Sequence, residues 1–127
     1  MKTPEIKAAK EAYHFAKENG KLDAQGENVI SQDAYYSYNY AFDVIKGRWI
    51  EAEEIIKTRP NFAYHYALNV IKGRWELGEN TISQSAKFSY YYAHIIKNKL
   101  PESWHNKMIM LAMNNDYWAK KYLEFIK

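Results

Sequence analysis

The chain has 127 residues, 47% of them apolar, which is enough for one domain with a sizeable core. Its 18 basic and 15 acidic side chains are interspersed and give a net charge of +3, which is typical of an ordinary solvated surface and not of a strong nucleic-acid binder. Cysteine is absent, which excludes disulfides, thiolate nucleophiles and cysteine-based zinc sites and favours a cytoplasmic location.

The beginning of the chain, Met1 to Glu5, leads into a charged amphipathic stretch, which is not the pattern of a signal peptide. No apolar run approaches the roughly 20 residues that a membrane span needs. We therefore expect no association with a membrane.

An internal repeat of 26 residues organises the sequence. The segment YAFDVIKGRWIEAE at 40–53 returns as YALNVIKGRWELGE at 66–79, and GENVISQDA at 26–34 returns two periods later as GENTISQSA at 78–86. One alanine marks the register of each unit: Ala16, Ala41, Ala67, Ala93 and Ala119. Tyrosine stands three positions before each of the first four anchors, and an aromatic residue directly precedes all five, ending with Trp118.

Repeats of this length predict stacked supersecondary units. We expect an all-α fold, an α-solenoid-like array of about four 26-residue helix-turn-helix repeats with a C-terminal capping helix. The whole chain, 1–127, then forms a single helical-repeat domain. Its repeats are approximately 8–32, 33–58, 59–84 and 85–111, followed by a capping helix at 112–127.

Each unit is predicted to begin with a first helix, at 33–46 in the second unit, whose apolar residues recur at helical spacing. We expect a left-handed residue to close this helix, because glycine or asparagine follows it in every unit: Gly20, Gly47, Gly73 and Asn98. Two residues are missing before Gly20 and one before Asn98.

A second helix of eight to ten residues is then predicted to start at Trp49 or Trp75, with leucine in the outer units. Acidic residues in its first turn suit the helix dipole. Pro60 ends the second helix before the next unit begins. Asp116 starts the last helix, which resembles a fifth first helix.

The KGRW turn has two interpretations. Lysine, arginine and tryptophan together could grip phosphate and stack on a base. A helix cap followed by a packing tryptophan explains the same residues more simply, because leucine replaces tryptophan in the outer units. We favour the cap.

The VIKGRW motif followed by Glu-x-Glu resembles tandem YAxxVIKGRWxEAE-type helical repeat proteins of tailed bacteriophages and some bacteria. The match is close over 38–83 and departs at 76–79, where Leu-Gly replaces Glu-Ala. The resemblance implies a helical repeat fold and a phage-encoded factor that binds a host or defence protein in the host cytoplasm. It implies no catalytic residue.

One face of the first helices, pointing away from the expected core, combines aromatic side chains with Asn, His and Lys, which is the usual composition of a binding patch. We call it the first-helix face, and its residues are Tyr35, Asn39, Phe42, Lys46, Asn61, His65, Leu68, Lys72, Lys87, Tyr91 and His94. Burial under a second helix or a dimer mate would explain the same composition.

We therefore expect a non-enzymatic protein-interaction module without metal or cofactor, since the chain has no HExxH, Walker, dinucleotide or G-x-S-x-G motif. Its partner is expected to be a protein, and a homo-oligomer is one alternative. The other alternative is a nucleic acid bound by the KGRW turns through Lys46, Arg48, Lys72, Arg74 and the adjoining tryptophans.

Overall fold

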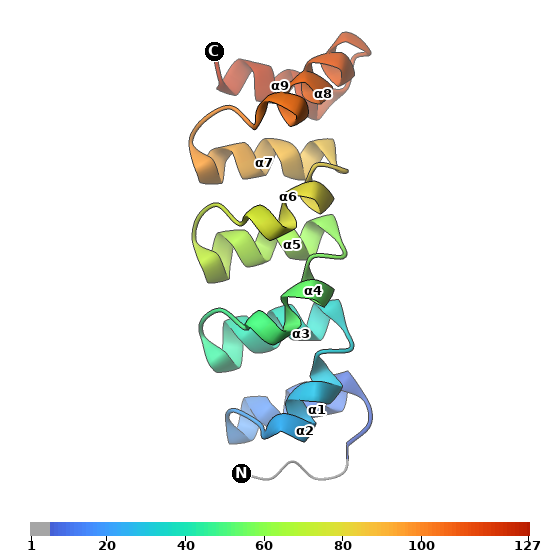
Figure 1. The fold of residues 1–127 in the computed structure, drawn as a ribbon, viewed down its shortest axis with the longest axis vertical. Helices are drawn as coiled ribbons and strands as arrows, with labels where there is room; N and C mark the ends of the chain where they lie inside the picture. Colours follow the sequence, from blue (N-terminus) through green and yellow to red (C-terminus); the bar gives the residue numbers. More distant parts are fainter. Residues whose placement is uncertain (1–5) are drawn as a thin grey trace.

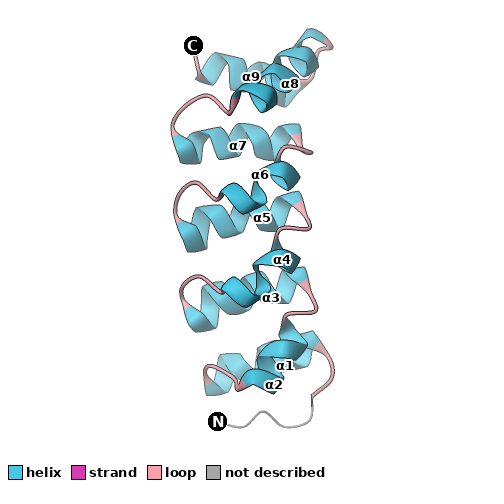
Figure 2. Ribbon diagram, in the orientation of Figure 1, coloured by secondary structure: helices cyan, strands magenta, loops and turns pink. Residues whose placement is uncertain are grey.

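The computed structural model describes residues 6–127, so the interpretation of Met1 to Glu5 lies outside the described part of the chain. Over those residues the chain consists of helices and loops and contains no strand (Figure 2). The predicted all-α class is confirmed.

First and second helices alternate along the chain. The first helices are α1 (Ala9–Asn19), α3 (Ala34–Tyr40), α5 (Pro60–Tyr66), α7 (Ala86–Ile96) and α9 (Tyr117–Phe125). A π-helical turn extends α3 and α5, as η1 (Ala41–Ile45) and η3 (Ala67–Ile71). The second helices are α2 (Ala24–Ile30), the 3₁₀ turn η2 (Ile50–Ala52) with α4 (Glu53–Ile56), α6 (Glu76–Ile82) and α8 (Glu102–Met113).

The helix pairs are stacked in chain order along the longest axis of the molecule (Figure 1). Each first helix packs against the next, from α1 on α3 to α7 on α9, while the second helices lie in front of this layer in Figure 1. The turns that join first to second helices all lie on the same side of the stack, on the left in Figure 1. We call this side the turn edge, formed by residues 20–23, 46–49, 72–75 and 97–101.

The anchor alanines occupy equivalent buried positions in the first four units. The carbonyl oxygen of each one accepts the backbone N–H of the residue that closes its helix, at 2.7–2.8 Å: Gly20 on Ala16, Lys46 on Ala41, Lys72 on Ala67 and Lys97 on Ala93. Small side chains one turn earlier, such as Ser37, Ala63 and Ser89, are also buried, and the serine hydroxyls bond to the carbonyl oxygens of Ile30 and Ile82 at the ends of the preceding second helices.

The left-handed residue that ends a first helix is glycine only in the first unit, at Gly20. The prediction for Gly47, Gly73 and Asn98 is wrong, because the lysine before each one adopts φ of 57–61° instead: Lys46, Lys72 and Lys97. The place of the left-handed residue is fixed by its hydrogen bond to the anchor carbonyl, whatever its residue type. The central units have one more residue between the anchor and this position than the fourth unit has, and their π-helical turns accommodate it.

The prediction of Ala119 as the last anchor is also wrong. The second helices α2 and α6 have seven residues each, fewer than the predicted eight to ten. The second helix α8 has 12 residues and ends at Met113, past the expected boundary at 111. The register of α9 shifts as a result. Tyr122, not Trp118, takes the buried tyrosine position, and Trp118 is half-buried on the outer side.

Candidate partner-binding face

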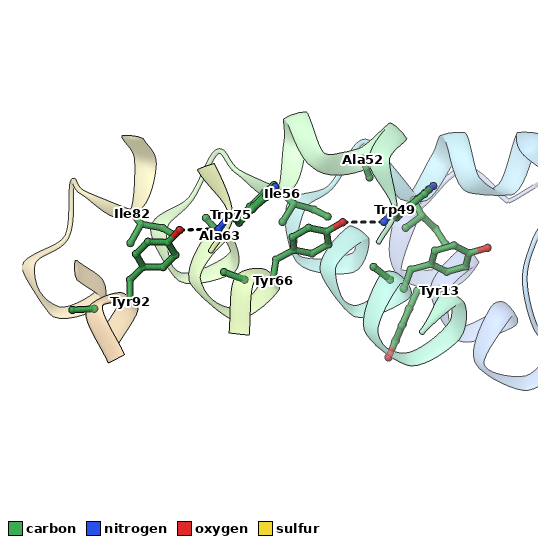
Figure 3. Packing of buried hydrophobic residues seen from close by; sticks show 14 of the residues in the cluster. Tyr13, Trp49, Ala52, Ile56, Ala63, Tyr66, Trp75, Ile82 and Tyr92 are labelled. Atoms are coloured by element: carbon green, nitrogen blue, oxygen red, sulfur yellow. Dashed lines mark hydrogen bonds between the residues drawn. The ribbon is translucent and has the colours of Figure 1, made fainter. Parts of the chain in front are cut away.

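A buried tyrosine joins each unit to the one before it. The hydroxyl of Tyr66 accepts the backbone N–H of Trp49 at 2.9 Å and donates to Glu53 at 2.6 Å, so it satisfies the start of the preceding second helix (Figure 3). The same arrangement recurs at two other junctions, Tyr40 with Leu22 and Glu27 and Tyr92 with Trp75 and Glu79. At the last junction the Tyr122 hydroxyl accepts the backbone N–H of Leu100 and shares a hydrogen bond with Nδ1 of His105 in place of a carboxylate. We call this arrangement the tyrosine clamp.

The KGRW turns are built into these clamps. Arg48 donates two hydrogen bonds to Glu53, at 2.8 and 3.0 Å, and Arg74 donates two to Glu79, at 2.7 and 3.2 Å. The indoles that follow are only 4% and 3% exposed and pack on the tyrosines of their own units, with ring centres 4.9 Å apart for Tyr40–Trp49 and 4.7 Å apart for Tyr66–Trp75. These contacts agree with the cap-and-packing interpretation of KGRW.

Electrostatics hold the clamp in one protonation state. Burial tends to raise the pKa of Glu53, but hydrogen bonds from Arg48 and Tyr66 outweigh it and leave the pKa below its ordinary value. Burial, followed by the bond to Glu53, raises the pKa of Tyr66 far above neutral pH. The hydroxyl therefore remains a donor to a carboxylate. Glu53, predicted as one of the acidic residues in a helix first turn, is also a buried structural group.

The fourth unit replaces the missing indole. Leu100 stands where the central units have tryptophan, and Trp104, one helical turn later, stacks on Tyr92 with ring centres 5.4 Å apart. Its indole N–H donates to the buried Ser89 hydroxyl at 2.8 Å. The degenerate unit therefore keeps an aromatic partner for its tyrosine by another route.

Every residue of the predicted first-helix face is exposed or half-buried. Three large side chains of this face are exposed, with exposed fractions of 50% for Tyr35, 45% for Phe42 and 41% for Leu68. The second helices do not cover them. These side chains are therefore accessible on the single chain.

Aromatic contacts connect this face from one helix to the next. Tyr35 meets Phe62 with ring centres 5.8 Å apart, and His65 meets Tyr38 of the preceding unit at 6.2 Å and Phe88 of the following unit at 6.2 Å. Tyr64 and Tyr91 continue the series at 5.7 Å. These contacts form a row of rings that runs along the stack from Phe42 and Tyr38 through His65 to Tyr91. A separate group of rings at the N-terminal end joins Tyr35 to Tyr36 and Phe62.

The tyrosine column three positions before the anchors takes part in this row, although its pattern predicts core. Tyr13 is buried, but Tyr38, Tyr64 and Tyr90 are half-buried between adjacent first helices. The Tyr13 hydroxyl donates to Asp43 at 2.5 Å, and the Tyr38 hydroxyl accepts from Asn69 at 2.8 Å, each in the following unit. The intermediate burial of these tyrosines depends on the offset between neighbouring first helices, and this offset cannot be predicted from the sequence.

The capping helix extends the row. Trp118 lies 5.3 Å from Tyr91, Lys87 lies over the Trp118 ring at 5.9 Å, and Phe125 lies 3.8 Å from His94, measured at ring centres. The sequence does not predict Trp118 and Phe125 as members of this surface, because it places the buried tyrosine position of α9 at Trp118 and not at Tyr122. Their aromatic character, spaced seven residues apart on one helix, was the available signal.

The charge on this side of the molecule is positive. Lys46 and Lys72 are exposed and have no ion-pair partner among residues 6–127, whereas Asp43 is engaged by Tyr13 and by Lys17 at 3.8 Å. Burial lowers the pKa of His65, so its imidazole is neutral at pH 7. The surface therefore combines neutral aromatic rings with unpaired lysines.

Within the described part of the chain, no cluster of three or more His, Cys, Asp or Glu side chains could hold a metal ion. Over the same residues, no helix combines the length and the apolar character needed to cross a bilayer. Comparison of the chain with family models, with curated proteins and with solved structures finds no match.

Proposed function

We propose that the chain is a non-enzymatic protein-interaction module that binds a partner through the first-helix face. The observation that carries this proposal is the set of exposed Tyr35, Phe42 and Leu68 side chains, of which Tyr35 packs on Phe62 and Phe42 stacks on Tyr38. Aromatic residues on a rigid scaffold are typical anchors of protein interfaces, because they bury much apolar area at little entropic cost.

The scaffold supports this use. Each clamp fixes one unit on the next through buried hydrogen bonds, so the side chains of successive first helices keep their relative positions. A partner that contacts several units then meets a preorganised surface, and little ordering free energy is lost on binding.

Capture experiments on matched variants test the proposal. Tagged wild type and Phe42→Glu/Leu68→Glu are used to capture proteins from the native host, together with Ile50→Glu/Leu77→Glu, which changes two exposed apolar residues of the second helices. We expect a protein that is retained by wild type and by the second-helix variant and lost by the first-helix variant. An untagged copy of the chain is included, so that self-association is recognised.

Circular dichroism establishes that all three proteins are folded. If the folded first-helix variant captures the same proteins as wild type, the assignment of this face is wrong.

We further propose, on the resemblance to phage repeat proteins, that the chain is phage-encoded and modulates a host or defence protein in the host cytoplasm. Capture from infected and uninfected cells tests this proposal. It fails if the retained protein is neither a host nor a defence component.

A nucleic acid remains the second candidate. The exposed Lys46 and Lys72 favour it, but the Arg48 and Arg74 guanidiniums already bind carboxylates and the adjoining indoles are buried. A mobility shift at low salt that weakens steeply with added salt is the expected signature, and no shift at low salt excludes this candidate.

A further inference from the structure

We propose that the protein partner presents acidic side chains, and that two basic grooves on the turn edge hold them. This inference rests on the proposed function, because it assigns a chemistry to the same partner at the border between the first-helix face and the turn edge, where Phe42, Lys46 and Lys72 belong to both the face and the first groove. It is carried by two cavities of similar composition at two separate junctions of the stack.

The first groove lies at the junction of the two π-helical turns, η1 and η3, and has a volume of about 240 Å³. Its lining residues are Phe42, Lys46, Gly47, Asn69, Val70 and Lys72. Two lysines thus stand beside an aromatic ring, a branched aliphatic side chain and an amide.

The second groove lies at the junction of α7 and α9 and has a volume of about 220 Å³. Its lining residues are Lys97, Asn98, Lys99, Phe125 and Ile126. The composition of the first groove is repeated almost residue for residue, although the phenylalanine comes from a different place in the unit. The two grooves arise from different backbone geometries, since the fourth unit has no π-helical turn.

The lysines of both grooves are cations of the turn edge without an ion-pair partner in the described part of the chain. Lys46, Lys72, Lys97 and Lys99 are exposed and form no ion pair within residues 6–127, whereas Arg48 and Arg74 are bound to Glu53 and Glu79. An acidic ligand would supply the missing counter-charges, and an adjacent apolar side chain would fill the space against Phe42 or Phe125.

The dimensions favour side chains of a larger partner. Both grooves are smaller than the roughly 300–1,000 Å³ of typical small-molecule sites. They lie two units apart, which is about 16–20 Å at the usual spacing of packed helices. An extended segment covers that distance with about five or six residues.

A protein segment also fits better than a nucleic acid. Binding of single strands combines a basic groove with aromatic rings that stack on the bases, but Trp49 and Trp75 next to the first groove are buried. Phe42 lies beside the lysines and offers an apolar wall for a side chain.

Fluorescence anisotropy with designed peptides tests the inference. The probe is a labelled 12-residue peptide with two Glu-Phe-Glu clusters centred six residues apart, compared with a one-cluster peptide and with the same peptide carrying lysine for glutamate. We expect the two-cluster acidic peptide to bind about tenfold more tightly than the one-cluster peptide at low salt, because the second contact is intramolecular. The lysine peptide should not bind.

Two variants remove one groove each, Lys46→Glu/Lys72→Glu and Lys97→Glu/Lys99→Glu, and each should reduce the affinity to the one-cluster level. Lys10→Glu/Lys120→Glu changes the net charge equally, at exposed sites on α1 and α9, and should change the affinity by no more than about twofold. If a glutamate variant does not fold, as judged by circular dichroism, the corresponding glutamine variant replaces it.

The inference is overturned if the acidic peptide does not bind, if it binds the groove variants as tightly as wild type, or if the charge control loses the same affinity. It is also overturned if a labelled 20-nucleotide single-stranded DNA binds more tightly than the peptide and is lost with the same substitutions. A captured partner that is lost by Phe42→Glu/Leu68→Glu but bound normally by Lys46→Glu/Lys72→Glu would leave the proposed function intact and refute only the acidic partner.

Discussion

The tyrosine directly before the anchor alanine of each of the second, third and fourth units performs two tasks at once. Its ring fills the core of its own unit, and its hydroxyl satisfies the backbone and the carboxylate of the unit before it. The sequence predicts the burial of this column from its helical spacing. It does not predict the hydrogen bonds, because the partners lie 13 and 17 residues away on a helix whose placement depends on the stacking.

Removal of one clamp hydroxyl tests this assignment. Tyr66→Phe leaves the buried N–H of Trp49 and a lone pair of Glu53 without a partner, so we expect the free energy of unfolding to fall by about 1–3 kcal/mol. Tyr38→Phe is the matched control, since its half-buried hydroxyl bonds only the Asn69 side chain, and it should cost clearly less. Urea denaturation measures both, and equal losses would contradict the clamp.

The pH dependence of stability reports on Glu53. Its pKa in the folded state lies below the value of about 4.3 expected for the unfolded chain. The carboxylate therefore stabilises the fold at higher pH, and this contribution is lost as the pH falls below about 4.3 toward the folded pKa.

We expect Glu53→Gln to be less stable than wild type at pH 7, and we expect this difference to shrink as the pH falls through that window. Glu54→Gln is the control, because Glu54 is exposed and pairs only with Lys57. Denaturation curves at several pH values measure the effect. A difference between wild type and Glu53→Gln that stays constant down to about pH 3 would contradict the assignment.

At the scale of helices, the sequence predicts the alternation of first and second helices and the helix starts at Asp33 and Asp116. The structure adds that both side chains cap their helices by accepting backbone N–H groups. The sequence does not predict how the extra residue of the central units is accommodated. The π-helical turn accommodates that residue and keeps the bond to the anchor carbonyl, so that Lys46 and Lys72 are left-handed like Lys97, which ends a helix without such a turn. No local pattern indicates this arrangement. The predicted register of α9 is wrong because α8 is longer than the other second helices.

A glycine substitution at one of these lysines should stabilise the protein. Lys72 has φ of 61°, a conformation that favours glycine, so we expect Lys72→Gly to gain about 1 kcal/mol. Lys121→Gly, in the interior of α9, should lose about the same amount. Thermal denaturation separates the two, and destabilisation by both would argue against the left-handed turn.

The residue type that fits in the first turn of a second helix, glycine or alanine, depends on how that helix begins. A Cβ at Gly78 would lie 2.5 Å from a ring carbon of Trp75, whereas the second unit has Ala52 at this place and begins with a 3₁₀ turn. We expect Gly78→Ala to destabilise the protein by about 1–3 kcal/mol, through displacement of the indole. Near-ultraviolet circular dichroism of the tryptophans, together with urea denaturation, detects it. An unchanged spectrum and unchanged stability would show that the contact is absent.

At the scale of the molecule, the clamps make each unit depend on its neighbours. Much of the candidate surface could be predicted at this scale, because a repeat places equivalent residues side by side, and the eleven predicted residues are all accessible. The half-buried tyrosines and the two rings of α9 could not be predicted, because their exposure depends on the offset between stacked helices.

Removal of one complete unit should preserve the fold. Deletion of 59–84 joins Thr58 to Ser85, and Tyr92 can then clamp Trp49 and Glu53 in place of Tyr66. We expect a helical protein with a cooperative but lower melting transition, because stability in such stacks is roughly a sum over units and their junctions. Deletion of 59–71, half a unit, should abolish cooperative unfolding, and equal behaviour of the two deletions would contradict the repeat.

The central claim, that the first-helix face binds the partner, is tested most directly by hydroxyl-radical footprinting of the chain alone and with its captured protein. We expect protection of Tyr35, Phe42 and Leu68 in the complex, with Ile50 and Leu77 on the second helices unchanged. Protection confined to the second helices, or none on the first-helix face, would contradict the account.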